Sequence, residues 1–381
     1  MKQIYKIKIE PLTAVHIGTG NKLLPTDYTI TSSPDNPNIK KYVKFSSDKI
    51  IDKILNSGTP QQKAELQKAC DSNDMNQLAK FFNKYFRMGS DYEANITRSF
   101  SRLYSDKIGK DLFKNSLAVD EMLHHANKPY IPGSSIKGAV RTAILNKNLL
   151  EDMSDDEYYE LINAKERDEK QIQEKALLML KKVKGIDNAK LDPFRCIEIS
   201  DCEFSAENQI VGQNRIVKLN REQELVGKDN KAQIIVEAIA GKLTKKETVS
   251  KFELRINEDL QNIELPNGFC INYQINLEDI ISACNFFFKA EFDKEYEKFY
   301  KNASDGVDKI FELKKLIDSI SEDSKTEFLL RIGRWSQVEY VTFCDDFRKQ
   351  KILDSTSRTI FDYDDQYLPM GWCKCTVEDK L

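Results

Sequence analysis

The sequence has few of the residues that build metal centres and disulfide frameworks. It contains three histidines, and His124 and His125 are neighbours whose side chains diverge on either a helix or a strand. The eight cysteines lie mostly within apolar runs at irregular spacing, with Cys373 and Cys375 as the only close pair. Such spacing is typical of reduced core thiols and leaves a zinc site two ligands short. We therefore expect no metal and no cofactor.

Long apolar runs are also lacking. No segment approaches the roughly 18 apolar residues of a membrane helix. Residues 1–8 alternate between apolar and polar side chains, where a signal peptide would have a continuous apolar core. With 40% hydrophobic and 31% charged residues, the chain has the composition of a globular protein that is long enough for two cores. These features predict a cytoplasmic protein without a membrane partner.

Two nucleotide-binding motifs are incomplete. Gly133 and Gly138 have the spacing of a Walker A motif, but Ala-Val follows where lysine and a hydroxyl residue would hold phosphate and magnesium. The Gly18–Gly20 turn lacks the third glycine of a dinucleotide-binding motif, because Leu23 occupies its place. The sequence therefore predicts neither a Walker A phosphate site nor a dinucleotide-binding site.

The net charge of −3 conceals a segregation of charge along the chain. Residues 1–50 hold eight lysines and four acids, and residues 101–150 hold eight basic residues and four acids, whereas residues 151–180 hold ten acids and four bases. The folded protein could present one basic face and keep the acidic segment elsewhere. Charge scattered over the whole solvated surface is the alternative.

The segment 130–145 predicts a strand end, a glycine turn and a helix start. Ser134 or Ser135 could cap the helix, whose free N–H groups would then face the turn. Lys137 and Arg141 are four residues apart and share one helix face. This arrangement fits a site for backbone phosphate, and a capped helix that enters the core is the other interpretation.

Hydrophobic periodicity predicts an α+β fold of tandem ferredoxin-like units with helical insertions. We expect one unit over 1–190 and a second over 191–381, the latter with a helical segment at 277–333. A polar loop at 31–38 between two strand-like pieces predicts a hairpin or an extended arm. Strands are expected at 5–9, 28–31, 42–45, 195–204, 232–240 and 251–256, with a last strand near 368–372 and 373–377, and helices at 48–104 and 151–184.

Five ordered segments resemble the RAMP proteins of CRISPR type III effector complexes, specifically the subunit-five family of the type III-A Csm complex. They are Pro11–Gly20, Tyr130–Leu145 with its IPGSSIKGA-R pattern, Asp192–Asp201, Arg331–Trp335 and Pro369–Trp372. The resemblance implies a subunit that caps the 3′ end of the crRNA filament and takes part in crRNA 3′-end maturation in antiviral defence. It implies no nuclease activity. The implied partners are crRNA, the repeated backbone subunit, other Csm subunits and host nucleases.

Family members hold guide RNA by its sugar-phosphate backbone, which agrees with the phosphate site inferred from the residues. The glycine-rich loop found in many RAMP proteins is reduced here to Gly-Arg-Trp at 333–335. The RNA-binding candidates are His16, Gly18, Gly20, Gly133, Ser134, Ser135, Lys137, Arg141, Arg331, Arg334 and Trp335.

Two of these residues leave other functions open. His16 could act as general acid or base in a metal-independent RNA endonuclease, or it could form a hydrogen bond at a strand end. Trp335 could stack a base or lie in the core. If the basic segments are buried or dispersed, the chain is a protein-only scaffold.

Overall fold

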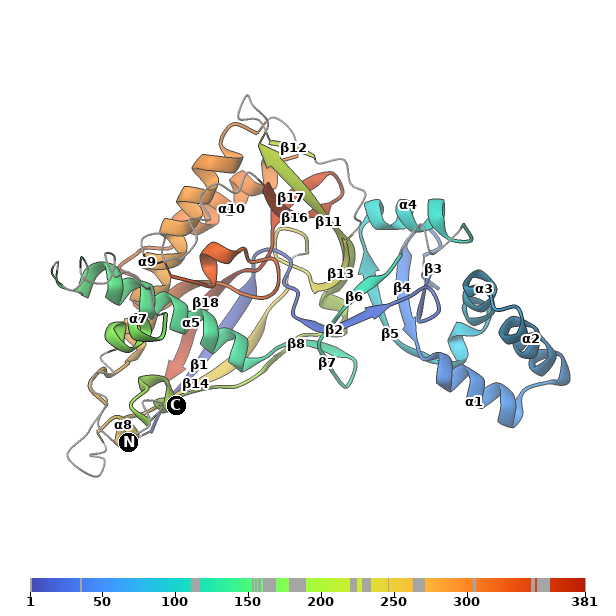
Figure 1. The fold of residues 1–381 in the computed structure, drawn as a ribbon, viewed down its shortest axis with the longest axis horizontal. Coiled ribbons are helices and arrows are strands. Elements are labelled where there is room, and N and C mark those ends of the chain that lie inside the picture. The colour runs from blue at the N-terminus through green and yellow to red at the C-terminus, as the bar shows by residue number, and fades with distance from the viewer. Residues whose placement is uncertain are drawn as a thin grey trace.

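The computed structural model describes most of the chain, and Figure 1 shows sheets and helices mixed throughout. The predicted α+β class with helical insertions is confirmed. None of the described helices is long and apolar enough to cross a lipid bilayer. The described residues are 2–34, 36–110, 117–152, 154, 156, 159, 169–177, 190–219, 225–227, 234–245, 247–262, 271–303, 306–343, 347 and 357–380.

A five-stranded antiparallel sheet contains both the first and the last described strand, in the order β15-β18-β1-β14-β9. Along β1, Ile7 and Ile9 face the core and alternate with the more exposed Lys6 and Lys8, so the predicted first strand is confirmed. The strands are β1 (Lys2–Pro11), β9 (Ile197–Ile199), β14 (Ser250–Asn257), β15 (Glu327–Arg331) and β18 (Trp372–Lys380).

Helices α5 (Gly133–Lys147) and α9 (Leu277–Glu295) pack against each other and share one hydrophobic core with this sheet. The chain runs from β1 through α5 to β9, and from β14 through α9 to β18. Within each of these two pairs the strands are parallel and have a third strand between them. This split βαβ arrangement is ferredoxin-like. Strands from both sides of residue 190 enter the sheet, and the division into 1–190 and 191–381 stays a prediction.

The described residues also form a ten-stranded sheet and a three-stranded sheet. The predicted hairpin around the polar loop is confirmed, because β3 and β4 pair antiparallel. The strands are β2 (Gly18–Leu23), β3 (Tyr28–Ser32), β4 (Lys40–Phe45), β5 (Ser90–Ile96), β6 (Val119–Met122), β7 (His124–His125), β8 (Lys128–Ile131), β10 (Cys202–Glu203), β11 (Gln209–Leu219), β12 (Leu225–Gly227), β13 (Ile234–Ile239), β16 (Ser357–Tyr363) and β17 (Gln366–Pro369).

Two predicted helical segments contain strands. Helix was expected throughout 48–104, but β5 interrupts it and pairs with β4 and β11. Tyr92 and Ala94 are buried there and alternate with more exposed residues, which is a strand period that the aromatic helix pattern before it obscures. The segment 277–333 likewise ends in β15. In both places, pairing in a sheet outweighs the local helical pattern.

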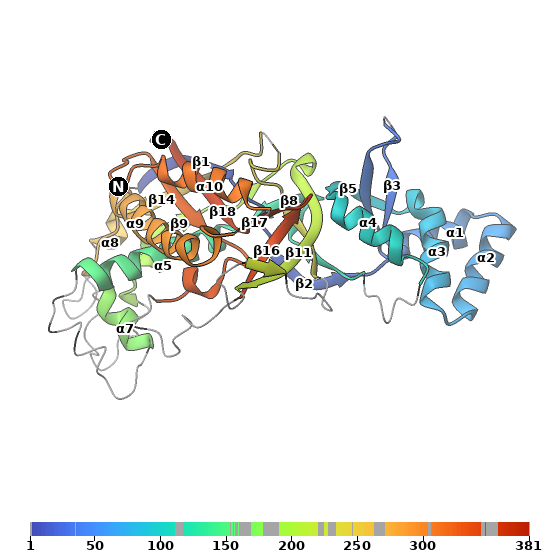
Figure 2. The ribbon, with the colours of Figure 1, turned by 90° about the horizontal axis from the view of Figure 1, so that it is seen from above.

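Three helices form an insertion between β4 and β5 and have their own hydrophobic cluster. Both ribbon views place this insertion at the opposite end of the molecule from α5 and α7 (Figure 1, Figure 2). The predicted block 151–184 contains α7, and most of it lies outside the described residues. The remaining helices are α1 (Ser47–Ser57), α2 (Pro60–Asp71), α3 (Met75–Tyr85), α4 (Arg98–Lys107), α7 (Glu169–Ala176), α8 (Glu258–Gln261) and α10 (Asp308–Asp318).

Candidate nucleic-acid interface

Helix α5 begins one residue before the predicted caps. Its N-cap is Pro132 and no side chain caps it, so the expected cap at Ser134 or Ser135 is wrong. The N–H group of Gly133 instead donates to Oδ1 of Asp201 at 2.8 Å. A carboxylate of the chain therefore already lies at the helix N-terminus, where the helix dipole favours negative charge.

The two glycines of α5 have different surroundings. A Cβ atom added to Gly133 would lie 2.0 Å from the carbonyl oxygen of Ile199. A backbone does come close to Gly133 as predicted, but it is the chain's own backbone at β9. Gly138 faces open space, with no heavy atom within 4 Å of an added Cβ. Of the two glycines, Gly138 is the one that leaves room for a ligand.

A pocket of about 350 Å³ opens beside α5. Lys137 and Arg141 line it from one face of the helix, as their spacing predicts. Arg195 adds a third cation from the turn before β9, and Asp192 is the one acid in the described lining. Three basic groups around one carboxylate favour an anionic ligand. The lining consists of Ser134, Lys137, Gly138, Arg141, Asp192, Phe194 and Arg195.

Contacts within the chain hold the two helix cations in place. The Nζ of Lys137 donates to the carbonyl oxygen of Ile197 at 2.8 Å, and partial burial lowers its pKa. Arg141 donates from Nη1 to both carboxylate oxygens of Asp192 at 2.9 and 2.8 Å, and its guanidinium lies 5.0 Å from the centre of the Phe194 ring. Lysine has three donors and arginine has five. Each side chain therefore keeps N–H groups that could donate hydrogen bonds to a phosphate.

Arg195 was not among the predicted site residues. Its side chain is exposed, and its Nη1 donates to the carbonyl oxygen of Lys190 at 2.7 Å. It lies in a short 3-10 helix, Pro193–Cys196, whose N-cap is Asp192. An acid followed by proline is a typical helix start and signals this turn in the sequence. No local pattern indicates that the turn packs beside α5.

The amino-terminal glycine turn and the carboxyl-terminal motif meet in space. The N–H group of Arg334 donates to the carbonyl oxygen of His16 at 2.8 Å, and a Cβ added to Gly333 would lie 2.5 Å from the same oxygen. Gly18 lies against the His16 ring, while Gly20 has a φ of 91° and open space around it. The fold thus brings the predicted site residues His16, Gly18 and Arg334 together, along with Gly333, which allows the close contact.

His16 is fully buried in this cluster. Its Nδ1 lies 2.6 Å from the carbonyl oxygen of Glu237, and its Nε2 has no hydrogen-bond partner. Burial lowers the pKa of the ring, which favours the neutral form. A Cβ on Gly18 would lie 2.8 Å from Nε2, so the glycine lets the chain pass over the ring. The geometry supports the interpretation of His16 as a hydrogen-bonding residue at a strand end.

Arg334 and Trp335 are more open to solvent. The Arg334 guanidinium lies 4.6 Å from the centre of the Trp335 ring, and its Nη1 lies 3.1 Å from Oδ2 of Asp120. Lys22 pairs with the other oxygen of Asp120. Two cations therefore share one carboxylate. Trp335 has a φ of 72°, a left-handed conformation that is rare for a bulky residue and clusters at functional sites.

Residues 8–336 match the family model of the RAMP superfamily. The chain belongs to the RAMP superfamily. No curated protein sequence matches it at a significant level. Two of the solved structures that resemble it match over nearly their whole lengths.

One is a chain in the cryo-EM structure of a Csm-crRNA-target RNA ternary complex of a type III-A CRISPR-Cas system. It is 17% identical, with a TM-score of 0.61 over 98% of this chain and 100% of that one. The other, the crystal structure of T. onnurineus Csm5, is 19% identical, with a TM-score of 0.62 over 96% of this chain and 99% of that one. At these identities the likeness establishes a shared fold.

In this RAMP protein Arg331 is a core residue, which corrects its predicted place in an exposed RNA-binding patch. It is 1% exposed, and its Nη1 lies 2.5 Å from Oε2 of Glu295. The guanidinium also lies 4.1 Å from the ring centre of Tyr340 and 5.3 Å from that of Trp372. RNA on the surface could not reach this side chain, so the patch reduces to Arg334 and Trp335.

Apart from Cys70, the described cysteines of this RAMP protein are buried and unpaired, as predicted for core thiols. Burial raises the pKa of the Cys202 thiol to about 12. Within the described ranges, no group of three or more histidine, cysteine or acidic residues is arranged to hold a metal ion. Low thiolate content makes these cysteines poor nucleophiles.

Proposed function

We propose that this RAMP protein is a single-copy, non-catalytic crRNA-binding subunit of a type III-A CRISPR effector complex. It caps the 3′ end of the crRNA filament beside the repeated backbone subunit and takes part in crRNA 3′-end maturation, with host nucleases as further partners. One observation carries the proposal: the fold matches T. onnurineus Csm5 over 99% of that chain and a Csm complex chain over 100%. The relatives' fold is thus present from end to end.

The chemistry of the α5 pocket supports a backbone contact. Lys137, Arg141 and Arg195 offer donors of fixed position to phosphate oxygens, and the open space at Gly138 lets a ribose-phosphate strand approach the helix. The Phe194 ring is buried under Arg141 and is not available for stacking. Contacts of this kind position a strand without reading its bases, which suits a guide whose sequence varies.

The Arg334 and Trp335 cluster supplies a second contact in this proposal. The half-buried indole could stack a base, and Arg334 would contact phosphate or extend the stack. Gly18 lies against the His16 ring beside this cluster, and Gly20, two residues further along β2, has open space around it. Lys22 adds a further cation beside Asp120. A strand end held at both sites would be fixed in position and direction.

The test compares two pairs of cations in a reconstituted type III-A complex. Lys137→Ala with Arg141→Ala should lower crRNA retention and reduce the slope of log affinity against log salt by about 1.4, since each lost single-strand phosphate contact removes about 0.7. Retention is measured by filter binding between 50 and 300 mM salt, and crRNA 3′-end lengths by sequencing. Unchanged retention and unchanged 3′ ends would remove the α5 pocket from the proposal.

Lys49→Ala with Lys53→Ala is a matched control. These lysines are also four residues apart on one helix, where one pairs with Asp91 at 2.6 Å and the other donates to the carbonyl oxygen of Met88 at 2.6 Å. Equal losses in both double variants would indicate a non-specific charge effect. Cleavage of repeat RNA in EDTA, lost in His16→Ala, would instead support the endonuclease, which the buried ring disfavours.

A further inference from the structure

The three-helix insertion is much longer than a connection between β4 and β5 requires. Strands β4 and β5 pair antiparallel and could be joined by a turn of two to five residues, yet α1, α2 and α3 lie between them. The insertion packs around its own cluster, which includes Ile54, Leu66 and Phe82. It lies at the opposite end of the molecule from α5 (Figure 1, Figure 2). It therefore contributes nothing to the α5 pocket.

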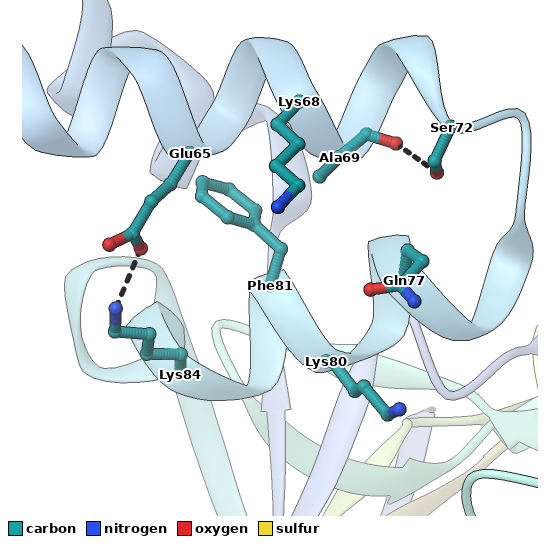
Figure 3. Close-up of a pocket in the computed structure, with 8 residues that line it drawn as sticks. All are labelled: Glu65, Lys68, Ala69, Ser72, Gln77, Lys80, Phe81 and Lys84. Carbon is teal, nitrogen blue, oxygen red and sulfur yellow. Dashed lines mark hydrogen bonds and ion pairs between the residues drawn. The ribbon is translucent and has the colours of Figure 1, made fainter.

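A groove of about 410 Å³ lies between α2 and α3. Figure 3 shows the ring of Phe81 rising from α3 toward α2, between Glu65 and Lys68. Phe81 is 6% exposed, so its ring edge forms an apolar floor together with Ala69. The described lining consists of Glu65, Lys68, Ala69, Ser72, Gln77, Lys80, Phe81 and Lys84.

The lysines of this groove differ in their partners. The Nζ of Lys84 lies 2.6 Å from Oε2 of Glu65, and this contact lowers the pKa of the Glu65 carboxyl to about 2. The side chains of Lys68 on α2 and Lys80 on α3 are exposed and have no ion-pair or hydrogen-bond partner among the described residues. Lys68 thus extends from α2 toward the apolar floor, while Lys80 lines the groove from α3 and extends away from α2, and neither charge is compensated (Figure 3).

We propose that this groove docks an acidic segment of a partner protein, with carboxylates at Lys68 and Lys80 and one apolar side chain on Phe81. An amphipathic helix with acidic flanks has this chemistry, and it binds grooves between helices. Electrostatic complementarity of this kind sets specificity and association rate more than affinity. The proposal does not rest on the proposed RNA-binding function.

Nucleic acid fits the groove less well. Phosphate recognition favours arginine, whose guanidinium binds two oxygens at once, and free helix N-termini. No arginine is in the described lining, and the carboxylate of Asp74 caps the start of α3 by accepting from the N–H group of Asn76. Glu65 adds a further carboxylate to the groove. Discrete acidic side chains meet two separated lysines better than a continuous phosphate backbone does.

The test selects ligands from a random 12-residue peptide library displayed on phage, with the full-length protein as bait. Wild type should enrich peptides with at least two acidic residues flanking an apolar one. Lys68→Glu with Lys80→Glu should abolish that enrichment. A synthetic peptide of the enriched sequence, followed by fluorescence anisotropy, should bind the reversed variant at least tenfold more weakly than wild type. Lys68→Gln with Lys80→Gln should give an intermediate loss.

Lys63→Glu is the matched control, because Lys63 is exposed on the same helix and does not line the groove. It should change peptide affinity less than twofold, and circular dichroism should show all variants folded. Three results would overturn the proposal: no acidic enrichment, equal loss in Lys63→Glu, or a 15-residue oligouridylate that binds more tightly than the peptide and depends on the same two lysines. The last result would assign the groove to nucleic acid.

Discussion

Two arginine–carboxylate pairs in this RAMP protein, each beside an aromatic ring, differ mainly in their exposure to water. The side chains of Arg331 and Glu295 are 0% and 2% exposed, whereas those of Arg141 and Asp192 are 26% and 22% exposed. In the buried pair, the hydroxyl of Tyr340 also donates to Glu295 at 2.6 Å, so the contacts are internal. In the α5 pocket, the partly exposed Arg141 keeps N–H donors that its contacts with Asp192 do not use. Burial thus distinguishes the structural Arg331 from Arg141, which we propose as a phosphate contact.

Breaking the buried pair should have the largest effect on stability. Arg331→Met leaves Glu295 with the more distant Arg358, whose Nε lies 3.3 Å from its Oε1. We expect the free energy of unfolding to fall by about 3 kcal/mol or more, because a buried charge loses its main partner. Urea denaturation followed by circular dichroism measures this loss.

Arg334→Met is the control for that measurement, since the Arg334 side chain is 54% exposed. Its free energy of unfolding should change by at most about 1 kcal/mol, as is usual for exposed ion pairs. Similar losses in the two variants would mean that burial does not distinguish the two arginines of this motif.

Alanine substitutions at the two glycines of α5 should have a smaller effect on stability, and they compare a buried position with an open one on the same helix. Gly133→Ala should lower the free energy of unfolding by about 1–3 kcal/mol, because its methyl group would overlap the carbonyl oxygen of Ile199. Gly138→Ala should raise it by up to about 1 kcal/mol, since alanine favours helix and meets no neighbour. Thermal unfolding of both variants tests this. A stabilised Gly133→Ala would show that β9 can move away from the helix.

Much of the fold could be predicted from local sequence patterns. The alternation in β1 and β14, the helical stripe of α9 and the polar loop between β3 and β4 were all readable, because each depends on neighbours in the sequence. The placement of Lys137 and Arg141 on one face follows from the period of 3.6 residues. Strands β5 and β15 were missed because each lies next to a long helical pattern and is stabilised by distant strands.

The site depends on contacts that no local pattern encodes. Asp201, which occupies the start of α5, is 68 residues from its hydrogen-bond partner. Arg195 joins the pocket from a turn that the sequence places in a strand region. No sequence pattern distinguishes Arg331 from Arg334. In the structure the chain turns at Gly333, where φ is 90°, so the Arg331 side chain enters the core and the Arg334 side chain faces solvent.

The smallest expected effect on stability concerns the exposed pair. Asp192→Asn removes the one acid of the described pocket lining and keeps an N-cap, since asparagine caps as well as aspartate does. The free energy of unfolding should change by no more than about 1 kcal/mol. Affinity for single-stranded RNA should rise about two- to fivefold at low salt, because the pocket gains net positive charge, and the gain should shrink as salt increases.

The matched control is Asp91→Asn, which removes a carboxylate that pairs with Lys44 and Lys49 away from α5. Fluorescence anisotropy with one labelled oligonucleotide at 50, 150 and 300 mM salt compares the two variants and Arg141→Ala. If Asp192→Asn weakens RNA binding as much as Arg141→Ala does, the carboxylate orients the guanidinium for phosphate. The gain in RNA affinity from orienting Arg141 would then exceed the loss from repulsion between the Asp192 carboxylate and phosphate. Arg141 and Asp192 would act as one preorganised unit.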